Sequence, residues 1–266
     1  MADSDARRQP ALEGARNFRD LGGYRSLDGR RVRWGQLYRS GALADLTVAG
    51  QEQVAALGIR TALDFRSPAE RRREPSPWDV GSVATLHWDY DFGDVSLRGI
   101  LAASSDFSVA GMRAAMLELY RRLPDLFAAP YAGLFEQLAH GQLPLVFHCA
   151  AGKDRTGVAA ALVLASLEIP HATIISDYTL TNTAIDLETV LARRWRNSIG
   201  VANDHAHLSQ ITPEVRRPLL EARPEYLQAA LEQMQSAHGS LQGYLAERLG
   251  VSTEALREIR ARLLEP

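Results

Sequence analysis

The chain has 266 residues, of which 46% are hydrophobic and 23% are charged, and its formal net charge at pH 7 is −2. This is an ordinary globular composition, and the small net charge argues against general nucleic-acid binding. The single cysteine excludes an intramolecular disulfide and a cysteine-rich metal site, and it fits a reducing compartment. Residues 1–11 lack a signal-peptide pattern, and no apolar run is long enough to span a bilayer. We therefore expect a cytoplasmic protein without a transmembrane segment, while secretion by a route that leaves no recognisable signal peptide stays open.

The N-terminal part is predicted to be a flexible lead over residues 1–14, followed by one domain over residues 15–266. Asp28-Gly29 between two strand-like runs predicts a hairpin. The polar residues Asn17–Asp20 and Arg39–Ser40 have two interpretations. They are either scaffolding that holds this part on a sheet or direct contacts to a substrate, and the sequence pattern supports both equally.

Helices and strands alternate after this point, which predicts an α/β domain whose central sheet is mostly parallel and flanked by helices. Thr47 is a typical N-cap for a helix that ends before Gly58, and residues 59–65 are typical of a central strand. Asp64 and Arg66 stand at the C-terminal end of that strand, where open α/β sheets bind ligands. They either orient a ligand-binding loop or pair with each other on the rim of the site, and for Arg66 we favour the pairing.

The middle of the chain contains a predicted strand at residues 83–86 and a Gly- and Ser-rich stretch before a predicted helix at residues 112–123. Long irregular segments of this kind are often lids, so residues 92–123 form either a lid or a solvent loop with a packed helix in it. A second amphipathic helix is predicted for residues 125–140. His205 and His207 invite a metal interpretation, but no further ligand stands at a suitable spacing, so we predict no metal site.

The most informative stretch is Leu145–Gly157, which predicts a buried strand, a short glycine-containing loop and the start of an Ala- and Leu-rich helix. Unpaired backbone N–H groups at such a junction bind an anion, above all a phosphate. Cys149 opens the loop and Arg155 closes it. The amides, the helix dipole and Arg155 all favour the nucleophilic thiolate, and Arg155 offers a planar fork for two phosphate oxygens. The loop is not a Walker A motif, because Asp154 follows the lysine where that motif needs Ser or Thr.

His148–Gly157 resembles the HC-x5-R-[ST] signature of cysteine-dependent protein tyrosine phosphatases. The Lys153-Asp154 pair is similar to that of the bacterial PtpB/LipA-like group, whose members tend to accept several classes of phosphorylated substrate. Further blocks of the chain resemble the same group: Asn17–Gly23, Leu37–Gly41, Asp64–Ser67, Asp177–Asn182 and Gly243–Gly250. The resemblance implies a tyrosine-phosphatase-like fold with a helical lid over about residues 92–123. It also implies hydrolysis of phosphate monoesters through a cysteinyl-phosphate intermediate.

Within the loop, the resemblance implies Cys149 as nucleophile, Arg155 as phosphate ligand and Asp154 as general acid. The alternative acids are Asp89 and Asp91, since Trp88-Asp89 is similar to the Trp-Pro-Asp loop of other tyrosine phosphatases but lacks the proline. The predicted substrate-binding residues are those of the loop and the helix start, and supporting roles are open for His148, Asp64, Arg66 and Asp89. The substrate-binding set is Ala150, Ala151, Gly152, Lys153, Asp154, Arg155 and Thr156.

No cofactor is required by this mechanism, because the loop itself supplies the positive potential. The expected partners are phosphotyrosine proteins first, then phosphoinositides, for which Lys153 adds a second positive charge, and then phosphoserine or phosphothreonine proteins. Two other classes of function remain: a phosphate-binding module with weak catalysis, and a sulfur- or arsenate-handling enzyme with a similar loop. The intact Cys149 and Arg155 argue against the first, and the single cysteine argues against arsenate reduction.

Overall fold

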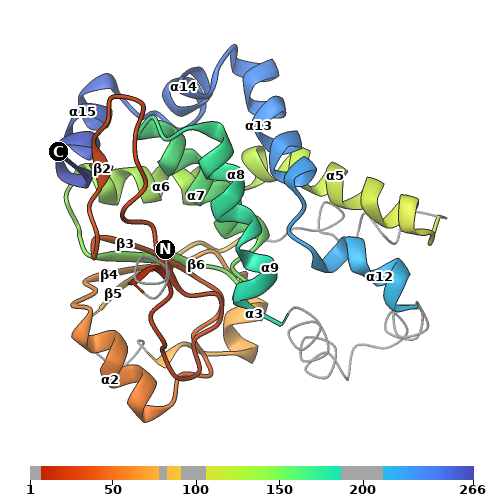
Figure 1. The fold of residues 1–266 in the computed structure, drawn as a ribbon. Coiled ribbons are helices and arrows are strands. Elements are labelled where there is room, and N and C mark those ends of the chain that lie inside the picture. The colour runs from red at the N-terminus through yellow and green to blue at the C-terminus, as the bar shows by residue number, and fades with distance from the viewer. Residues whose placement is uncertain (1–6, 78–82, 91–105, 187–211) are drawn as a thin grey trace.

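The computed structural model describes residues 7–77, 83–90, 106–186 and 212–266. At its centre lies a five-stranded sheet in the order β1-β3-β6-β4-β5 (Figure 1). β1 pairs antiparallel with β3, and the other neighbouring strands are parallel. The predicted α/β fold with a mostly parallel sheet is therefore confirmed. In sheet order, the strands are Arg19–Asp20, Leu37–Ser40, Leu145–His148, Thr61–Asp64 and Ala84–His87.

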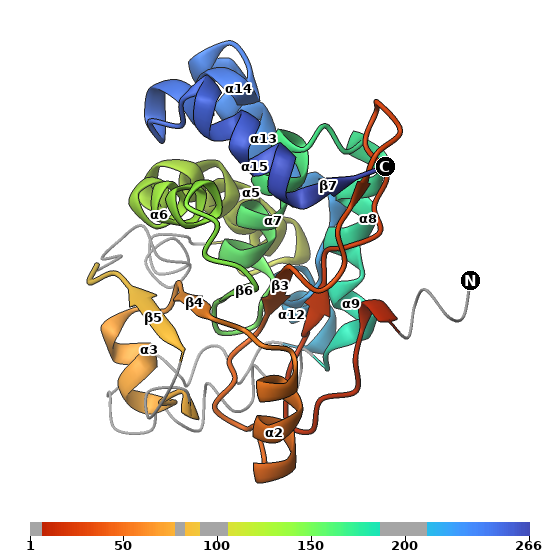
Figure 2. The ribbon, with the colours of Figure 1, turned by 90° about the vertical axis from the view of Figure 1, so that its left-hand side faces the viewer.

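The two faces of the sheet bury separate hydrophobic clusters, because successive side chains of a strand point to opposite faces. Val146 of β6 belongs to a small cluster with Val54 of α2 (Val48–Ala56). Leu145 and Phe147 belong to the large cluster. Figures 1 and 2 show α2 on one side of the sheet and a thick helical layer on the other. That layer contains α5 (Val109–Leu126), α6 (Ala128–Ala139), α7 (Asp154–Ser166), α8 (His171–Thr179), α13 (Pro224–His238) and α15 (Thr253–Leu263).

Helix α7 occupies the middle of the helical layer and is buried along nearly its whole length. Its small alanines allow neighbouring helices to approach closely, and its aliphatic residues fill the core, so a helix that is apolar on all sides beyond its first turn is stable here. The shorter helices lie around this layer or beside the sheet. They are α3 (Pro68–Arg73), α9 (Thr181–Ala184), α12 (Pro213–Leu220), α14 (Leu241–Gly243) and a π-helical turn, Tyr244–Arg248.

The predicted helix boundaries agree well where a cap marks them. The Thr47 side chain accepts a hydrogen bond from the Gly50 amide, and Gly58 has a φ of +66° just beyond α2. Helix α5 begins earlier than predicted because Ser108 caps it. It also continues through Pro124, so that α6 begins only at Ala128.

The predicted hairpin is present around Asp28-Gly29. The Val32 amide donates to the Tyr24 carbonyl over 2.8 Å, and Gly29 has a φ of +92°. Its second arm also forms β2 (Arg31–Val32), which pairs with β7 (Leu264–Glu265) at the C-terminus. The sequence did not indicate this pairing, since β7 is only two residues long and joins segments more than 200 positions apart.

Two predictions about mobile segments fall partly outside the described residues. Residues 1–6 of the expected lead lie outside, whereas Arg8 donates to the Asp20 carbonyl over 3.0 Å and stacks 3.7 Å from the Tyr24 ring centroid. Residues 92–105 of the expected lid also lie outside, and helix α5 beyond them buries Met112, Met116 and other side chains in the core. Among the residues described, no helix combines the length and apolarity needed to cross a membrane.

Candidate active site

Cys149 lies directly after β6, at the C-terminal edge of the parallel strands. In the sheet, His148 is in register with Ser40 of β3 on one side and Asp64 of β4 on the other. Residues 149–153 form the loop, and α7 begins at Asp154. The predicted strand, loop and helix are therefore all present, and they bring Cys149 and Arg155 to the two ends of one turn.

The carbonyl groups of the loop are turned toward the N-terminal part of the chain. The Ala150 carbonyl accepts from the Ala42 amide over 2.9 Å. Asn17 Nδ2 donates to the carbonyls of Ala151 and Gly152, each over 3.0 Å. In a trans peptide the C=O and the following N–H point in opposite directions. The amides of residues 151–153 therefore point away from Asn17, toward the inside of the loop, which is the arrangement that binds an anion.

Gly152 is required by the backbone of the loop. Its φ is +68°, and a Cβ there would lie 2.6 Å from the Ser40 carbonyl oxygen. The loop thus passes directly over the end of β3, and any side chain at position 152 would push it away.

A buried charge network holds this side of the loop. Arg39 donates to the Gly152 carbonyl over 2.8 Å and to Asp177 Oδ2 over 2.6 Å. Arg19 donates to Asp177 Oδ1 over 3.1 Å, and Tyr24 donates to the same oxygen over 3.0 Å. Burial alone would raise the pKa of Asp177, but the two arginines outweigh it and lower that pKa below its usual range. The sequence left two roles open for Asn17–Asp20 and Arg39–Ser40, scaffolding or direct contact with substrate. These hydrogen bonds favour scaffolding.

Arg155 is held by a carboxylate that the sequence analysis did not identify. Its two terminal nitrogens donate to Glu70 Oε2 and Oε1 over 2.7 and 2.8 Å, and Nη1 also donates to the Phe65 carbonyl over 2.8 Å. Burial opposes the charge of Arg155, but Glu70 outweighs this and raises the Arg155 pKa well above its ordinary value. Glu70 also closes a capping box with Ser67 at the start of α3. That Ser-x-x-Glu signal was present in the sequence, although its link to Arg155 was not.

Asp154 is the first residue of α7, and its carboxylate faces α5. Tyr120 of α5 donates a hydrogen bond of 2.7 Å to Asp154 Oδ1, and the Tyr178 hydroxyl lies 2.6 Å from the Tyr120 hydroxyl. The Asp154 side chain is 28% exposed, so it is reachable from solvent although it is anchored. Neither tyrosine was identified from the sequence, because both belong to helices far from the loop in the chain.

Lys153 differs from the expectation of a lysine directed at substrate. Its Nζ donates to the Leu219 and Leu220 carbonyls at the end of α12, over 2.6 and 3.2 Å, and its side chain is nearly inaccessible to solvent. The lysine thus ties the loop to the C-terminal end of α12, where a positive charge complements the helix dipole.

The candidates for supporting roles are all buried close to the loop, except Asp89. Arg66 pairs with Asp64, as favoured from the sequence, through Nε and Nη2 at 2.6–3.0 Å, but this pair is buried instead of lying on a rim. His148 Nδ1 is 3.8 Å from Asp64 Oδ1, and burial lowers the His148 pKa, so the ring is neutral near pH 7. Thr156 is also buried, and its hydroxyl has no hydrogen-bond partner among the described residues.

The alternative general acid, Asp89, lies apart from these contacts. Its side chain is 78% exposed and pairs with Arg71 of α3 at 2.6 Å. Asp91 lies outside the described residues, as do His205 and His207 of the metal interpretation. Within the described ranges, no group of three or more potential metal ligands is present.

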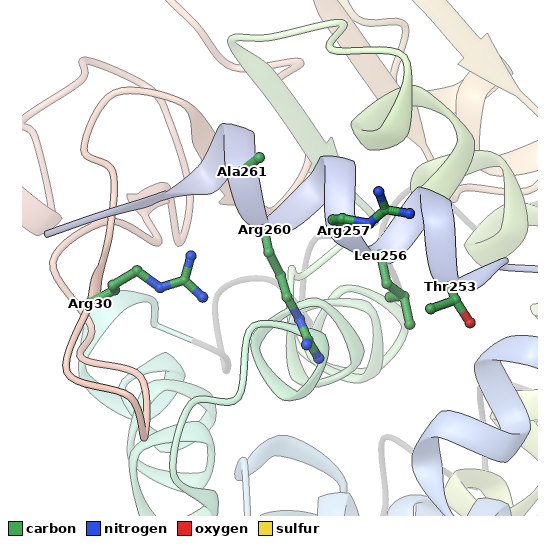
Figure 3. Close-up of a pocket in the computed structure, with 6 residues that line it drawn as sticks. All are labelled: Arg30, Thr253, Leu256, Arg257, Arg260 and Ala261. Carbon is green, nitrogen blue, oxygen red and sulfur yellow. The ribbon is translucent and has the colours of Figure 1, made fainter.

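A cavity lies apart from the loop, at the surface of α15. Its volume is about 310 Å³, and it is lined by arginines and by small or apolar residues (Figure 3). Each arginine is paired with a carboxylate: Arg30 with Asp28, Arg257 with Glu254, and Arg260 with Glu168. None of the residues predicted for the site contributes to this cavity, and its charges are balanced, so we assign it no role.

Comparison with known proteins agrees with the geometry of the loop. The model of the tyrosine phosphatase family matches residues 10–265. The chain belongs to the tyrosine phosphatase family. The resemblance to the PtpB-like group, and with it the prediction of a phosphate monoester hydrolase, is confirmed.

Three relatives illustrate the match. A protein of Cupriavidus necator whose name assigns it to the tyrosine-protein phosphatases is 36% identical over 261 residues, covering 96% of this chain and 89% of the relative. The triple specificity protein phosphatase PtpB of Mycobacterium tuberculosis is 31% identical over 285 residues, covering 95% and 98%. A tyrosine-protein phosphatase of Nostoc commune is 26% identical over 230 residues, covering 85% and 73%.

Proposed function

We propose that this member of the family hydrolyses phosphate monoesters in two displacements, with Cys149 as nucleophile and phosphotyrosine as the first substrate class. The observation that carries the proposal is the orientation of the loop. Its carbonyls are bonded to Ala42, Asn17 and Arg39, so its amides converge on the side where a phosphate binds next to Cys149.

In the first displacement, the Cys149 thiolate forms an S–P bond while the P–O bond of the ester breaks. The loop amides and Arg155 stabilise the charge on the three other phosphate oxygens, and Asp154 gives a proton to the leaving oxygen. In the second displacement, water attacks phosphorus, the S–P bond breaks and Asp154 takes the proton back from water. The buried Thr156 hydroxyl, next to Arg155 in the chain, is available to donate to the departing sulfur.

The substrate order is phosphotyrosine, then phosphoinositide, then phosphoserine or phosphothreonine. A relative named for triple specificity supports a broad range. Lys153, on which the phosphoinositide expectation rests, must leave the Leu219 and Leu220 carbonyls before it can meet a second phosphate. This contact favours phosphotyrosine over phosphoinositide. The substrates are therefore best compared as a panel after the basic chemistry is tested.

The test is hydrolysis of p-nitrophenyl phosphate in EDTA and fresh reductant by the wild type and by Cys149→Ser. We expect activity that is independent of metal and absent in Cys149→Ser. Binding of phosphate or vanadate without turnover by the wild type would instead indicate a binding module. Unchanged activity in Cys149→Ser would overturn the assignment of the nucleophile.

A further inference from the structure

The Asp154 carboxylate is held at only one of its two oxygens. Tyr120 donates to Oδ1 over 2.7 Å, and Lys153 Nζ lies 3.4 Å from the same atom. Oδ2 receives no hydrogen bond from the side chains in the part of the chain that the structure describes. In a neutral carboxyl group, the oxygen without the proton is the better acceptor. A donor fixed at Oδ1 therefore favours placing the proton on Oδ2.

The direction of the hydrogen bonds among Tyr178, Tyr120 and Asp154 follows from which of these groups can donate. An ionised carboxylate only accepts, so Tyr120 must donate to Asp154. Its hydroxyl oxygen is then the acceptor for Tyr178, 2.6 Å away. Burial raises the pKa of both phenols well above their ordinary value, so both remain donors throughout the working pH range of an enzyme.

The packing of the two tyrosines fixes this chain of hydroxyls in place. Tyr120 and Tyr178 are fully buried, and their rings meet edge to face with centroids 6.2 Å apart. Tyr226 of α13 also packs against Tyr120, with ring centroids 5.6 Å apart. A Cβ at Gly157 would lie 2.9 Å from the Tyr178 ring, so the glycine of α7 makes room for Tyr178.

We propose that Tyr120, supported by Tyr178, is a positioning residue for the general acid: its hydroxyl holds Oδ1 of Asp154 and leaves Oδ2 as the atom that gives and takes the proton. This inference rests on the proposed role of Asp154. In the first displacement the proton moves from Oδ2 to the ester oxygen as the P–O bond breaks. In the second it returns to Oδ2 from the attacking water as the S–P bond breaks.

The experiment compares two aryl phosphates that differ in leaving group. p-Nitrophenolate leaves with little protonation, whereas phenolate needs the acid. Because kcat/KM reports the first displacement, Asp154→Asn should lower kcat/KM for phenyl phosphate by about 10²- to 10⁴-fold and have a much smaller effect on kcat/KM for p-nitrophenyl phosphate. Tyr120→Phe keeps the ring and should show the same selectivity, with a loss on the order of tenfold for phenyl phosphate and little change in KM.

A double mutant and a control variant distinguish a positioning role of Tyr120 from a nonspecific loss of activity. In the Asp154→Asn background, Tyr120→Phe should cause no further loss, because the carboxyl group through which it acts is already gone. Tyr244→Phe removes another buried hydroxyl, which donates to the Pro124 carbonyl, and should leave kcat unchanged on both substrates. Tyr178→Phe should resemble Tyr120→Phe with a smaller loss, and it provides a second test if Tyr120→Phe folds poorly.

The outcomes distinguish the inference from the proposed function. If Asp154→Asn lowers kcat/KM equally for both substrates, the general acid is misassigned and the role of Tyr120 fails with it. If Asp154→Asn is selective but Tyr120→Phe and Tyr178→Phe are not, only the positioning role fails. An additive loss in the double mutant would also contradict it, because Tyr120 would then act independently of Asp154.

Discussion

The two ends of the phosphate loop are supported by different chemistry. The carbonyl side, at residues 150–152, rests on buried ions: Arg39, Arg19 and Asp177 form a network in which two cations share one anion. At the other end Lys153 and Arg155 make ion pairs. The hydrogen bond that holds the Asp154 carboxylate, however, comes from the neutral hydroxyl of Tyr120, which Tyr178 supports. Ions fix the backbone that binds phosphate, where any shift would misalign the amides. Hydroxyls hold the acid, which must gain and lose a proton in every cycle.

The largest effect is expected on the ionic side. Asp177→Asn removes the anion from two buried arginines, and breaking such a pair typically costs about 3–5 kcal/mol of folding free energy. Urea unfolding monitored by circular dichroism measures this loss. Asp125→Asn, which breaks an exposed pair with Arg248, is the matched control and should cost less than about 1 kcal/mol. Equal losses in both variants would contradict the importance of the buried network.

Glu70→Gln tests the orientation of Arg155. The amide cannot accept from both terminal nitrogens, so we expect kcat/KM for p-nitrophenyl phosphate to fall on the order of tenfold to a hundredfold. Ser67→Ala is the control, because it removes the hydroxyl cap of α3 and keeps the Glu70 carboxylate. It should lower stability by about 1 kcal/mol without lowering kcat/KM. If Glu70→Gln lowered stability but not kcat/KM, Glu70 would act only as a cap of α3.

The pH dependence of stability follows from the buried His148 and from Asp177 of the ionic network. The folded-state pKa values of His148 and Asp177 are both lowered, so the unfolded chain binds more protons as pH falls. Stability should therefore decline below about pH 6.5 through His148, and further below about pH 4 through Asp177. Urea midpoints measured between pH 8 and pH 3.5 test this. A midpoint that rises as the solution is acidified would contradict it.

Lys153→Met tests the role of the lysine at the end of the loop that carries Asp154. Because Nζ is bound to the Leu219 and Leu220 carbonyls, we expect kcat/KM for an aryl phosphate and for a soluble phosphoinositide to change by the same factor. A selective loss on the phosphoinositide would show that the lysine leaves α12 to bind a second phosphate. The ratio of the two values is the measurement.

The smallest effect is expected for Asp89→Asn. This carboxylate is exposed and paired with Arg71, so the pH–rate profile for phenyl phosphate should match that of the wild type. Asp154→Asn, in contrast, should abolish the decline on the basic side of that profile, where the acid would otherwise lose its proton. The reverse result would move the general acid to Asp89.

The sequence predicted those parts of the molecule that local patterns determine. Leu145–Gly157 combines an apolar strand, a glycine and fixed offsets between Cys149 and Arg155, so the strand, loop and helix could be placed without tertiary information. The cap at Thr47 and the turn at Asp28-Gly29 are equally local.

The partners of the loop could not be predicted, because they depend on contacts between distant segments. Glu70 is 85 positions from Arg155, and Tyr120 is 34 positions from Asp154. A helix pattern shows that Tyr120 is on a buried face, but not that its hydroxyl meets a carboxylate. The contact of Lys153 with the carbonyls of α12 could not be predicted for the same reason, and its predicted role in substrate binding stays a prediction.

The central claim is that Cys149 becomes phosphorylated. The most direct measurement is rapid acid quenching during turnover of p-nitrophenyl phosphate, followed by mass spectrometry of the peptide that contains Cys149. We predict that this peptide gains the mass of one phosphoryl group, and that the modified fraction rises in Asp154→Asn, where water attack lacks its base. Turnover without any phosphorylated Cys149 peptide, in the wild type and in Asp154→Asn alike, would contradict the two-displacement mechanism.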